Sequence, residues 1–506
     1  MSDSKKGKNT RARAKTPSQK FVDVLKSKRF GIALAAIELV LSLILIGMLM
    51  YLNMLPLKYF LPIVVVLLIV GAYLMVCMFL KKFRTFAKII CVILSVVMAF
   101  GIYYVGYASG TFDKIGGADT KTDVVNVYVM KEDAAEKLKD TEGYTYGKLQ
   151  NLDAENTDAA IADIDKSLGS SINPEEYKSI QELMDALFTG EVQAIVMNQA
   201  YAGAMKDTDG YSDFEDRTKV VYSTTIKTKI EAVKKIDVTS NAFTVFISGI
   251  DTNGSVSTTS RSDVNILAVV NPDTKEILLI NTPRDYYVPL SISDGMPDKL
   301  THAGIYGVNV SMDTLGMLYN TDVDYYFRLN FTGFTGIIDA LGGITVHSDY
   351  AFTTMHGGDN IVVGDNYLSG IQALGFVRER YSLAGGDNQR GKNQMAMIKA
   401  VVKKMASPAI LNNYAGLMDS ISDSFETSLS SSQISDLVRM QLNEGGTWNV
   451  QQYAVAGNGD NAECYSFASG GTAYVMRPDM TTVEKAKELV QKVYNGETLT
   501  EEDVTQ

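Results

Sequence analysis

The chain has 506 residues, of which 46% are hydrophobic and 21% are charged, and its formal net charge is −11. This length exceeds one ordinary domain and allows a large hydrophobic core. Only three cysteines are present, which excludes a small fold that depends on disulfides.

Three apolar segments stand near the N-terminus, at Gly31 to Leu52, Tyr59 to Leu80 and Phe86 to Tyr107. Each is long enough to cross a hydrocarbon core of about 30 Å as a helix. The first is not a cleavable signal peptide, because its apolar run is too long and another follows at once. We therefore predict a basic tail at residues 1–30 and three transmembrane helices at residues 31–108.

The positions of the basic residues predict how these helices are oriented. Ten Lys and Arg residues precede the first span, and Lys81, Lys82, Arg84 and Lys88 flank the loop between the second and third. The loop between the first and second carries only Lys58. Since basic flanks stay in the cytoplasm, we expect a multi-pass protein of the cell membrane with its N-terminus inside and its C-terminal part outside. A basic flank beside a span is topogenic or faces lipid more often than it binds nucleic acid.

The exterior part is strongly acidic. The first 108 residues carry fifteen Lys and Arg against three acids, although the whole chain is negative. This argues against nucleic acid as an external partner. Cys464 is the only exterior cysteine, so no disulfide can form within this part. Glu38 lies inside the first span at an energetic cost; it is a functional relay, pairs with a basic group such as Lys88, or is protonated.

A connector at residues 109–121 leads into a predicted small α+β accessory domain at residues 122–237. The sequence indicates no chemistry for this domain. Its expected elements are strands at Val124 to Met130 and Val192 to Met197, and helices around Glu132 to Lys139 and Pro174 to Phe188.

Residues 238–506 begin with the apolar strand Phe243 to Asp251, followed by a predicted hairpin. The arms of this hairpin, Val264 to Val270 and Glu276 to Asn281, flank the turn Asn271-Pro272-Asp273. Antiparallel pairing brings the residues just outside the arms to the same open end.

Asp263 and Arg284 are those residues, so they are expected to lie together. Asp251 and Asp263 both stand at strand ends. Carboxylate oxygens of this kind bind hard divalent cations, such as Mg²⁺ or alternatively Mn²⁺. The alternative is that both acids are simply solvated.

Two further elements are expected downstream. Tyr325 to Leu329, a helix reaching Leu341, a Gly342-Gly343 stop and Ile344 to His347 read as a strand–helix–strand unit. Pro478 to Asn495 reads as a closing helix.

An arginine cluster lies between Phe376 and Lys399. Ser369 and Gln372 have capping-box spacing, which predicts a short helix that ends at Gly375. The alternation from Phe376 to Arg380 then predicts a strand with Arg378 and Arg380 on one face.

Asp387 is expected to cap a second helix, on which Arg390 and Gln394 share one side. Gathered arginines usually bind an oxyanion, because the guanidinium fork matches phosphate or carboxylate. The alternative is a surface salt-bridge cluster with Glu379 and Asp387.

These stretches, with KLTHAG (Lys299 to Gly304) and DYYFRLNFTGFTGIIDALGGI (Asp324 to Ile344) between them, closely resemble the LytR–CpsA–Psr family. The resemblance runs from about Asn241 to Asn393 and beyond. The segment GGDNQRGKNQ (Gly385 to Gln394) most resembles the capsule-associated streptococcal CpsA branch. The wider family usually has an arginine before the glutamine that aligns with Gln394, whereas this chain has Asn393.

The resemblance implies an α/β catalytic domain, with a mixed sheet and helices on both faces. It also implies a Mg²⁺-dependent phosphotransferase that moves a glycan, here expected to be capsular polysaccharide, from undecaprenyl pyrophosphate to peptidoglycan. Asp251 and Asp263 would hold the metal ion, and Asp263 is a weak candidate for the general base. The expected pyrophosphate ligands are Arg284, Lys299, Arg378, Arg380, Arg390 and Gln394. Of these, Arg284, Arg378 and Arg380 are expected to be catalytic together with Asp263. A polyprenyl tunnel is implied along Phe331, Phe334, Ile337, Ile338 and Leu341.

Two alternatives remain from the sequence. One is a lipid pyrophosphate hydrolase that uses the same site with water as acceptor. The other is a non-catalytic membrane regulator that contacts a kinase or polymerase of capsule synthesis. Other chemistries are disfavoured, because His302, His347 and His356 show no zinc-type spacing and no G-x-S-x-G or Walker pattern occurs. We expect His302 to be a structural hydrogen-bonding residue.

Overall fold

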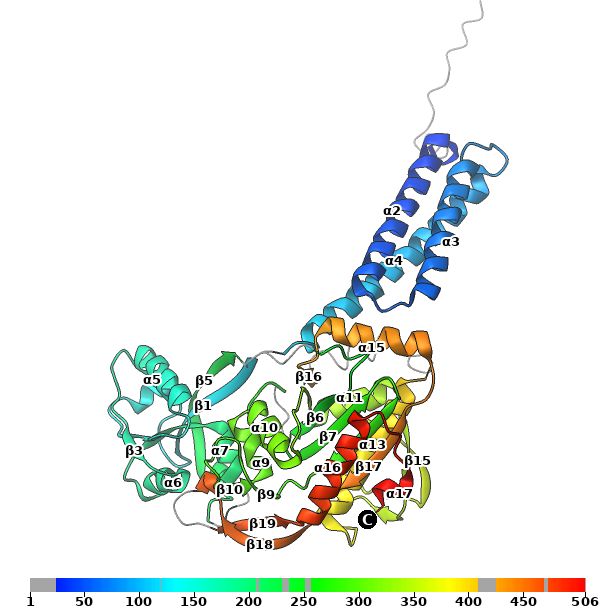
Figure 1. Cartoon of the computed structure of the whole chain (residues 1–506). Coiled ribbons are helices and arrows are strands. Elements are labelled where there is room, and N and C mark those ends of the chain that lie inside the picture. Colours follow the sequence, from blue (N-terminus) through cyan, green and yellow to red (C-terminus); the bar gives the residue numbers. More distant parts are fainter. Residues whose placement is uncertain are drawn as a thin grey trace, which may run out of the picture. The chain divides into compact units, whose positions relative to one another are not determined.

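The computed structural model describes residues 24–118, 120–205, 208, 210–229, 236–250, 256–407, 425–467 and 472–505. The chain divides into two compact units, which are described separately (Figure 1). The first comprises residues 1–110 with 438–443, and the second comprises residues 111–437 with 444–506.

Three long apolar helices begin the described chain: α2 (Lys28–Leu52), α3 (Leu57–Cys77) and α4 (Arg84–Ile115). Ser27 caps α2 by accepting a hydrogen bond from the Phe30 amide, and Asn53 ends that helix in the left-handed conformation. All three helices are long and apolar enough to cross a membrane. The prediction of three candidate spans is therefore confirmed, and the third helix continues beyond its predicted end.

Glu38 is buried within this helical unit, where its carboxylate accepts a hydrogen bond from the Ser42 hydroxyl at 3.1 Å. Lys88, the proposed ion-pair partner, instead donates to the carbonyl oxygens of Leu25 (2.6 Å) and Ser27 (2.9 Å). The expected Glu38–Lys88 pairing is wrong, because Lys88 satisfies carbonyl groups at the start of α2.

The accessory domain is built on a five-stranded sheet of order β3-β2-β4-β1-β5. Its strands are β1 (Thr120–Met130), β2 (Tyr146–Leu149), β3 (Glu175–Tyr177), β4 (Ala194–Asn198) and β5 (Thr218–Lys229), and its main helices are α5 (Ala154–Leu168), α6 (Ile180–Thr189) and α7 (Gln199–Ala204).

Two expected helices of this domain differ from the structure. In place of the helix around Glu132 to Lys139 there is only a 3-10 turn, Leu138–Thr141. Asp133 accepts a hydrogen bond from the Ala135 amide, and such local bonds compete with helix formation. The helix expected to begin at Pro174 starts at Ile180, after β3, because Ser179 provides the cap.

A six-stranded mixed sheet forms the centre of the following domain, in the order β16-β11-β6-β7-β8-β17. The pairs β11–β6 and β17–β8 are parallel, whereas the pairs β16–β11, β6–β7 and β7–β8 are antiparallel. The strands are β6 (Phe243–Ile250), β7 (Val264–Asn271), β8 (Glu276–Asn281), β11 (Tyr325–Asn330), β16 (Phe425–Thr427) and β17 (Asn449–Ala454).

Helices cover both faces of this sheet, as the resemblance implies. On one face, α10 (Val308–Tyr319) and α16 (Met480–Tyr494) share a buried core with Leu267 and Ile280. On the other face, Met395 of α13 (Gly386–Met405) packs against a second set of sheet residues. The domain therefore has the predicted α/β class, and α16 is the predicted closing helix (Figure 1).

The predicted hairpin is present as β7 and β8, paired from Asn271↔Glu276 to Ile266↔Asn281. The Asn271 side chain accepts hydrogen bonds from the amides of Asp273 and Thr274, which stabilises the turn.

The predicted strand–helix–strand unit is only partly correct. Helix α11 (Phe331–Ala340) follows β11, and Gly342 and Gly343 stop it with φ values of +72° and +79°. The next strand, β12 (Ile344–Ser348), leaves the central sheet and pairs with β15 (Gly364–Leu368).

The strand predicted at Phe376 to Arg380 is wrong. Ser369 does form a capping box with Gln372, but helix α12 (Gly370–Arg378) continues through Gly375. A Cβ atom at position 375 would lie 2.6 Å from the His356 carbonyl oxygen. Gly375 therefore serves close packing inside the helix instead of ending it.

Candidate functional site

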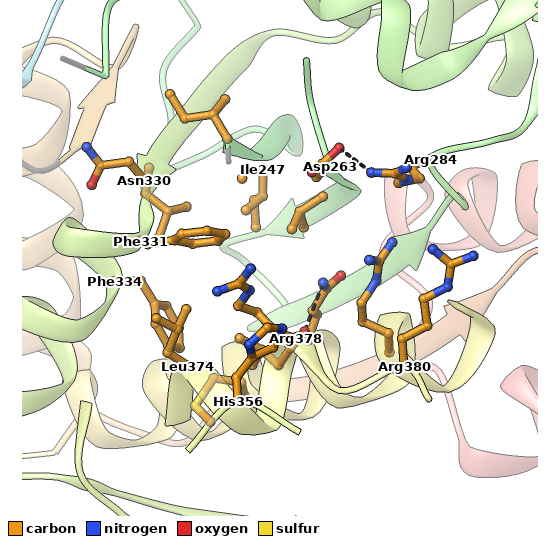
Figure 2. Close-up of a pocket in the computed structure, with 18 of the residues that line it drawn as sticks. Ile247, Asp263, Arg284, Asn330, Phe331, Phe334, His356, Leu374, Arg378 and Arg380 are labelled. Atoms are coloured by element: carbon orange, nitrogen blue, oxygen red, sulfur yellow. Dashed lines mark hydrogen bonds and ion pairs between the residues drawn. The ribbon is translucent and has the colours of Figure 1, made fainter. Parts of the chain in front are cut away.

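A pocket of about 260 Å³ opens between the central sheet and helices α11, α12 and α13 (Figure 2). Its walls are largely apolar, and their side chains come from all of these elements. They include Ile247, Val264, Phe331, Phe334, Leu374 and Met397. Phe331 and Phe334 line this pocket, whereas Ile338 belongs to a buried core cluster against which Phe334 also packs. The polyprenyl tunnel stays a prediction.

The open end of the β7–β8 hairpin supplies an ion pair to the pocket. Asp263 and Arg284 form an ion pair of 3.0 Å between Oδ1 and Nη1, with side chains that are 18% and 12% exposed. The Thr301 hydroxyl also donates to Asp263 Oδ1 at 3.3 Å. The hairpin thus brings Asp263 and Arg284 together as the sequence predicts.

Helix α12 and the turn after it supply two more pocket residues, Arg378 and Arg380. The Arg378 guanidinium lies 4.2 Å from the ring centroid of Phe331, which orients it by a cation–π contact. Figure 2 shows both arginines on one side of the pocket, across from Asp263 and Arg284. Arg378 and Arg380 thus line the same cavity, although the strand predicted at Phe376 to Arg380 is absent from the structure.

The backbone after α12 is fixed by the buried carboxylate of Glu379. It accepts hydrogen bonds from the amides of Arg380, Tyr381 and Ser382, and from the amide of Met355 at 2.6 Å. Burial raises the pKa of Glu379, but the hydrogen bonds from backbone amides lower it more, so this pKa lies below its ordinary value. The turn that presents Arg380 is therefore held by an ionised side chain, not by an Arg–Glu ion pair.

Helix α13 contributes Arg390 and Gln394, which both line the pocket as predicted from their spacing. Asp387 is not the cap, because α13 begins at Gly386 after Gly385. Asp387 lies in the first turn, where it forms an ion pair with Arg390. Gln394 donates to the Val377 carbonyl oxygen at 3.2 Å, which ties α13 to α12.

Lys299 does not line the pocket in the described part of the chain. Its side chain is 3% exposed, and its Nζ lies 3.3 Å from Asp285 Oδ1. Lys299 ends the short strand β10 (Pro297–Lys299), which turns its side chain toward the interior. A direct contact with pyrophosphate is therefore not supported for this residue.

His302 has the structural role expected of it. It is fully buried, and its Nδ1 lies 2.7 Å from Asp298 Oδ1. The other Asp298 oxygen accepts hydrogen bonds from the amide (2.8 Å) and the hydroxyl of Ser466. Burial raises the pKa of Asp298, but the adjacent His302 and Ser466 groups lower it more, so this pKa lies below its ordinary value.

The predicted metal site can be tested only in part, since Asp251 lies outside the described residues. Asp263 presents a carboxylate to the pocket, which is a ligand type that Mg²⁺ prefers. No group of three or more His, Cys, Asp or Glu side chains suited to a metal occurs among the described residues. Asp263 therefore fits one oxygen ligand of a metal ion.

The polar pocket residues Asn330, His356 and Tyr381 were not predicted from the sequence. Asn330 accepts a hydrogen bond from the Gly333 amide as the cap of α11. This capping position just after a strand is a signal that could have placed it at the sheet edge. His356 lies in a turn, and its sequence neighbours give no indication of the pocket.

A pocket with apolar walls and several arginines suits an amphiphilic ligand with an anionic head. The fold and this site agree with the family comparison, in which the LytR–CpsA–Psr model matches residues 210–486. The chain belongs to the LytR–CpsA–Psr family. A second model, described as DNA polymerase processivity factor, matches residues 81–197, less than a quarter of the chain and including all of α4.

The curated relatives agree with this assignment. The chain is 32% identical to polyisoprenyl-teichoic acid–peptidoglycan teichoic acid transferase TagU of Enterococcus faecalis over 51% of this chain and 83% of the relative. It is 30% identical to the protein of the same name from Bacillus cereus, over 44% and 71%. The crystal structure of B. subtilis TagV is also similar, with 21% identity and a TM-score of 0.43 over 51% of this chain and 99% of that chain. The resemblance to the capsule-associated branch stays a prediction.

Proposed function

We propose that this chain is a membrane-anchored phosphotransferase that moves a glycopolymer from undecaprenyl pyrophosphate to peptidoglycan. The observation that carries the proposal is the placement of Arg284, Arg378, Arg380 and Arg390 around one apolar pocket. The names of the curated relatives support the same donor and acceptor classes. Capsular polysaccharide is the glycan we propose, from the resemblance of the GGDNQRGKNQ segment.

The apolar and the charged residues of the pocket would bind different parts of the donor. The apolar walls receive the prenyl units next to the pyrophosphate, and the arginines bind the phosphate oxygens with planar forks. At about 260 Å³, the pocket is slightly smaller than typical ligand sites, which span roughly 300–1,000 Å³. It therefore suits the head of the lipid and its first prenyl units, and the rest of the chain extends beyond it.

The reaction itself needs positioning and charge more than covalent help. An acceptor hydroxyl on peptidoglycan attacks the phosphorus that bears the glycan, and the bond between the two phosphates breaks. Undecaprenyl phosphate leaves, and the glycan is attached through a phosphodiester. Asp263 is a poor general base, since it accepts hydrogen bonds from Arg284 and Thr301.

We further propose that Asp263 and Asp251 hold Mg²⁺, with Mn²⁺ as an alternative. The metal ion would neutralise charge on the phosphate oxygens. Asp263→Ala should weaken Mg²⁺ binding, as measured by calorimetry on the full chain. Unchanged Mg²⁺ affinity in both Asp263→Ala and Asp251→Ala would contradict the metal site.

The decisive test uses the full chain in detergent with a lipid-pyrophosphate-linked glycan and peptidoglycan fragments. Mass spectrometry should show a phosphodiester-linked product together with polyprenyl phosphate. Release of free glycan phosphate in place of the linked product would identify a hydrolase. Intact donor would favour a regulator.

The localisation proposal places the N-terminus in the cytoplasm and the domains after α4 outside the cell. A cysteine introduced at Ser109 should react with an impermeant thiol reagent on cells without a wall, and one at Ser4 should not. The opposite labelling pattern would contradict the topology.

A further inference from the structure

Residues 256–262, the described part of the connection between β6 and β7, end directly at the pocket residue Asp263. They are held by the accessory domain through Thr122 of β1. The Thr122 amide donates to the Ser257 carbonyl oxygen at 3.0 Å, and the Thr259 amide donates to the Thr122 carbonyl oxygen at 2.8 Å. Thr122 and Thr258 thus form a parallel bridge, so that this loop adds a short strand to the edge of β1.

A buried arginine of the central sheet holds the same loop from another direction. Arg328 of β11 donates through Nη2 to the Thr258 carbonyl oxygen (2.8 Å) and to the Ser260 hydroxyl (3.2 Å). Its Nη1 lies 3.9 Å from Glu426. A buried guanidinium is costly unless its donors are satisfied, and two of its contacts fix this one loop.

The far end of the loop is fixed against the central domain. The Asp263 amide donates to the Gly249 carbonyl oxygen at 2.9 Å, and the Ser262 amide donates to the Thr301 carbonyl oxygen at 3.2 Å. Gly304 also approaches closely, since a Cβ atom there would lie 2.6 Å from the Ser260 carbonyl oxygen. Contacts from β1, β11 and the residues around Gly304 thus define the path into Asp263.

The accessory domain is also packed firmly enough to act as a support. Its residues Tyr201 and Ala204 share one buried core cluster with Ile305, Cys464 and Val475 of the following domain. The Tyr201 ring lies 6.3 Å from that of Tyr306. A loop bonded to β1 is therefore bonded to a framework that is continuous with the pocket domain.

We propose that the accessory domain is a positioning element of the pocket, in which Thr122, together with Arg328, holds residues 257–260 so that Asp263 stays against Arg284. The inference rests on the proposed function for its consequence in turnover. Reacting groups must be placed to within about 0.5 Å, and a displacement of about 1 Å can cost on the order of 10²-fold in rate.

Thr122→Pro in the full chain tests this directly, because proline removes the Thr122 amide hydrogen that is donated to the Ser257 carbonyl oxygen. Turnover should fall by on the order of 10²-fold, while the thermal midpoint stays close to that of the unchanged protein. Thr120→Pro is the matched control, since it puts proline on the same side of β1 outside the loop contact. Equal losses in both variants would overturn the proposal.

Arg328 provides an independent pair of variants. Arg328→Met should lose activity, and Arg328→Lys should recover part of it, because lysine keeps a charged donor for the Thr258 carbonyl oxygen. Equal activity of the two variants would contradict a positioning role for this hydrogen bond.

A double-variant cycle shows whether the effect passes through Asp263. In an Asp263→Asn background, Thr122→Pro should cost less than about twofold in turnover, since coupled sites are not additive. A full further loss of on the order of 10²-fold would show that Thr122 acts on something else.

Hydrogen–deuterium exchange separates this inference from the proposed function. Exchange over residues 257–263 should rise in Thr122→Pro and Arg328→Met and stay unchanged in Thr120→Pro. This readout needs no turnover, so it remains decisive if the chain proves not to be a transferase. Unchanged exchange in Thr122→Pro would overturn the positioning role.

Discussion

The pocket and the Asp298 cluster (Asp298, His302 and Ser466) both gather charged groups in the same domain, but they treat charge differently. Among the described residues, four arginines and one carboxylate line the pocket. In the Asp298 cluster both carboxylate oxygens accept hydrogen bonds from buried groups, at 2.7 Å from His302 and 2.8 Å from the Ser466 amide. The pocket carries excess positive charge beside a cavity, whereas the Asp298 carboxylate has hydrogen-bond partners within the protein.

This difference separates a binding role from a structural one. A matched buried cluster contributes to stability, and removing one partner leaves an uncompensated polar group. Excess positive charge beside an apolar cavity is instead matched by a ligand that brings negative charge. Perturbing the two groups should therefore affect two different measurements.

The largest effect is expected for the double variant Arg378→Ala, Arg380→Ala. Each lost charge-assisted hydrogen bond is worth roughly 1.5–3 kcal/mol, so turnover should fall by on the order of 10²–10⁴-fold. The assay measures linked glycan by mass spectrometry. Arg477→Ala is the control, since that arginine pairs with Asp460 on the surface and lies 5.3 Å from the Tyr287 ring. Normal turnover in the double variant would show that these arginines do not bind the donor.

Asp298→Ala should act on stability instead of donor binding. Removing the partner of a buried hydrogen-bonding group costs about 1–3 kcal/mol, and Asp298 binds both His302 and Ser466, so the urea midpoint should fall accordingly. Trp448, the only tryptophan, precedes β17 and reports unfolding of the central sheet by its fluorescence. Asp460→Ala, at an exposed pair, should change stability by less than about 0.5 kcal/mol. An equal midpoint for the two variants would contradict the structural role of the cluster.

Arg378→Lys sharpens the comparison, because it keeps the charge and removes the fork. A single ammonium group cannot bind two phosphate oxygens in the planar geometry of arginine. Turnover should fall by about ten- to a hundredfold, with the Trp448 unfolding midpoint unchanged. Full activity would show that net charge alone accounts for donor binding.

Much of the fold could be predicted because local signals and tertiary structure agree. The β7–β8 hairpin followed from its two apolar arms and its Asn271 turn, and it correctly placed Asp263 beside Arg284. The apolar spans and the closing helix α16 were equally clear. The residues that determine each of these elements lie within a short stretch of sequence.

The misplaced elements depended on contacts between distant residues. Gly375 looked like a helix stop, but it is needed for the approach of the His356 carbonyl oxygen. Lys299 looked like a phosphate ligand, but it lies against the buried Asp285 carboxylate. The role of Arg328 depends on Thr258, seventy residues earlier, so no local pattern could reveal it.

The smallest expected effect is a pH dependence of the Asp298 cluster. The folded-state pKa of Asp298 lies below its ordinary value of 3.8. Its contribution to stability is therefore fully present above about pH 4 and is lost as the pH falls through the folded pKa. Asp298→Asn does not titrate, so the difference in urea midpoint between the unchanged protein and this variant should shrink from pH 6 to pH 3.

Carboxyl groups away from the cluster titrate in both proteins and cancel in this difference, which therefore reports Asp298 together with its contact His302. A difference in midpoint that stays constant from pH 6 to pH 3 would mean that the pKa of Asp298 is the same in the folded and the unfolded protein. The hydrogen bonds from His302 and Ser466 would then not favour the ionised carboxylate, and the contrast between this cluster and the charged pocket would fail.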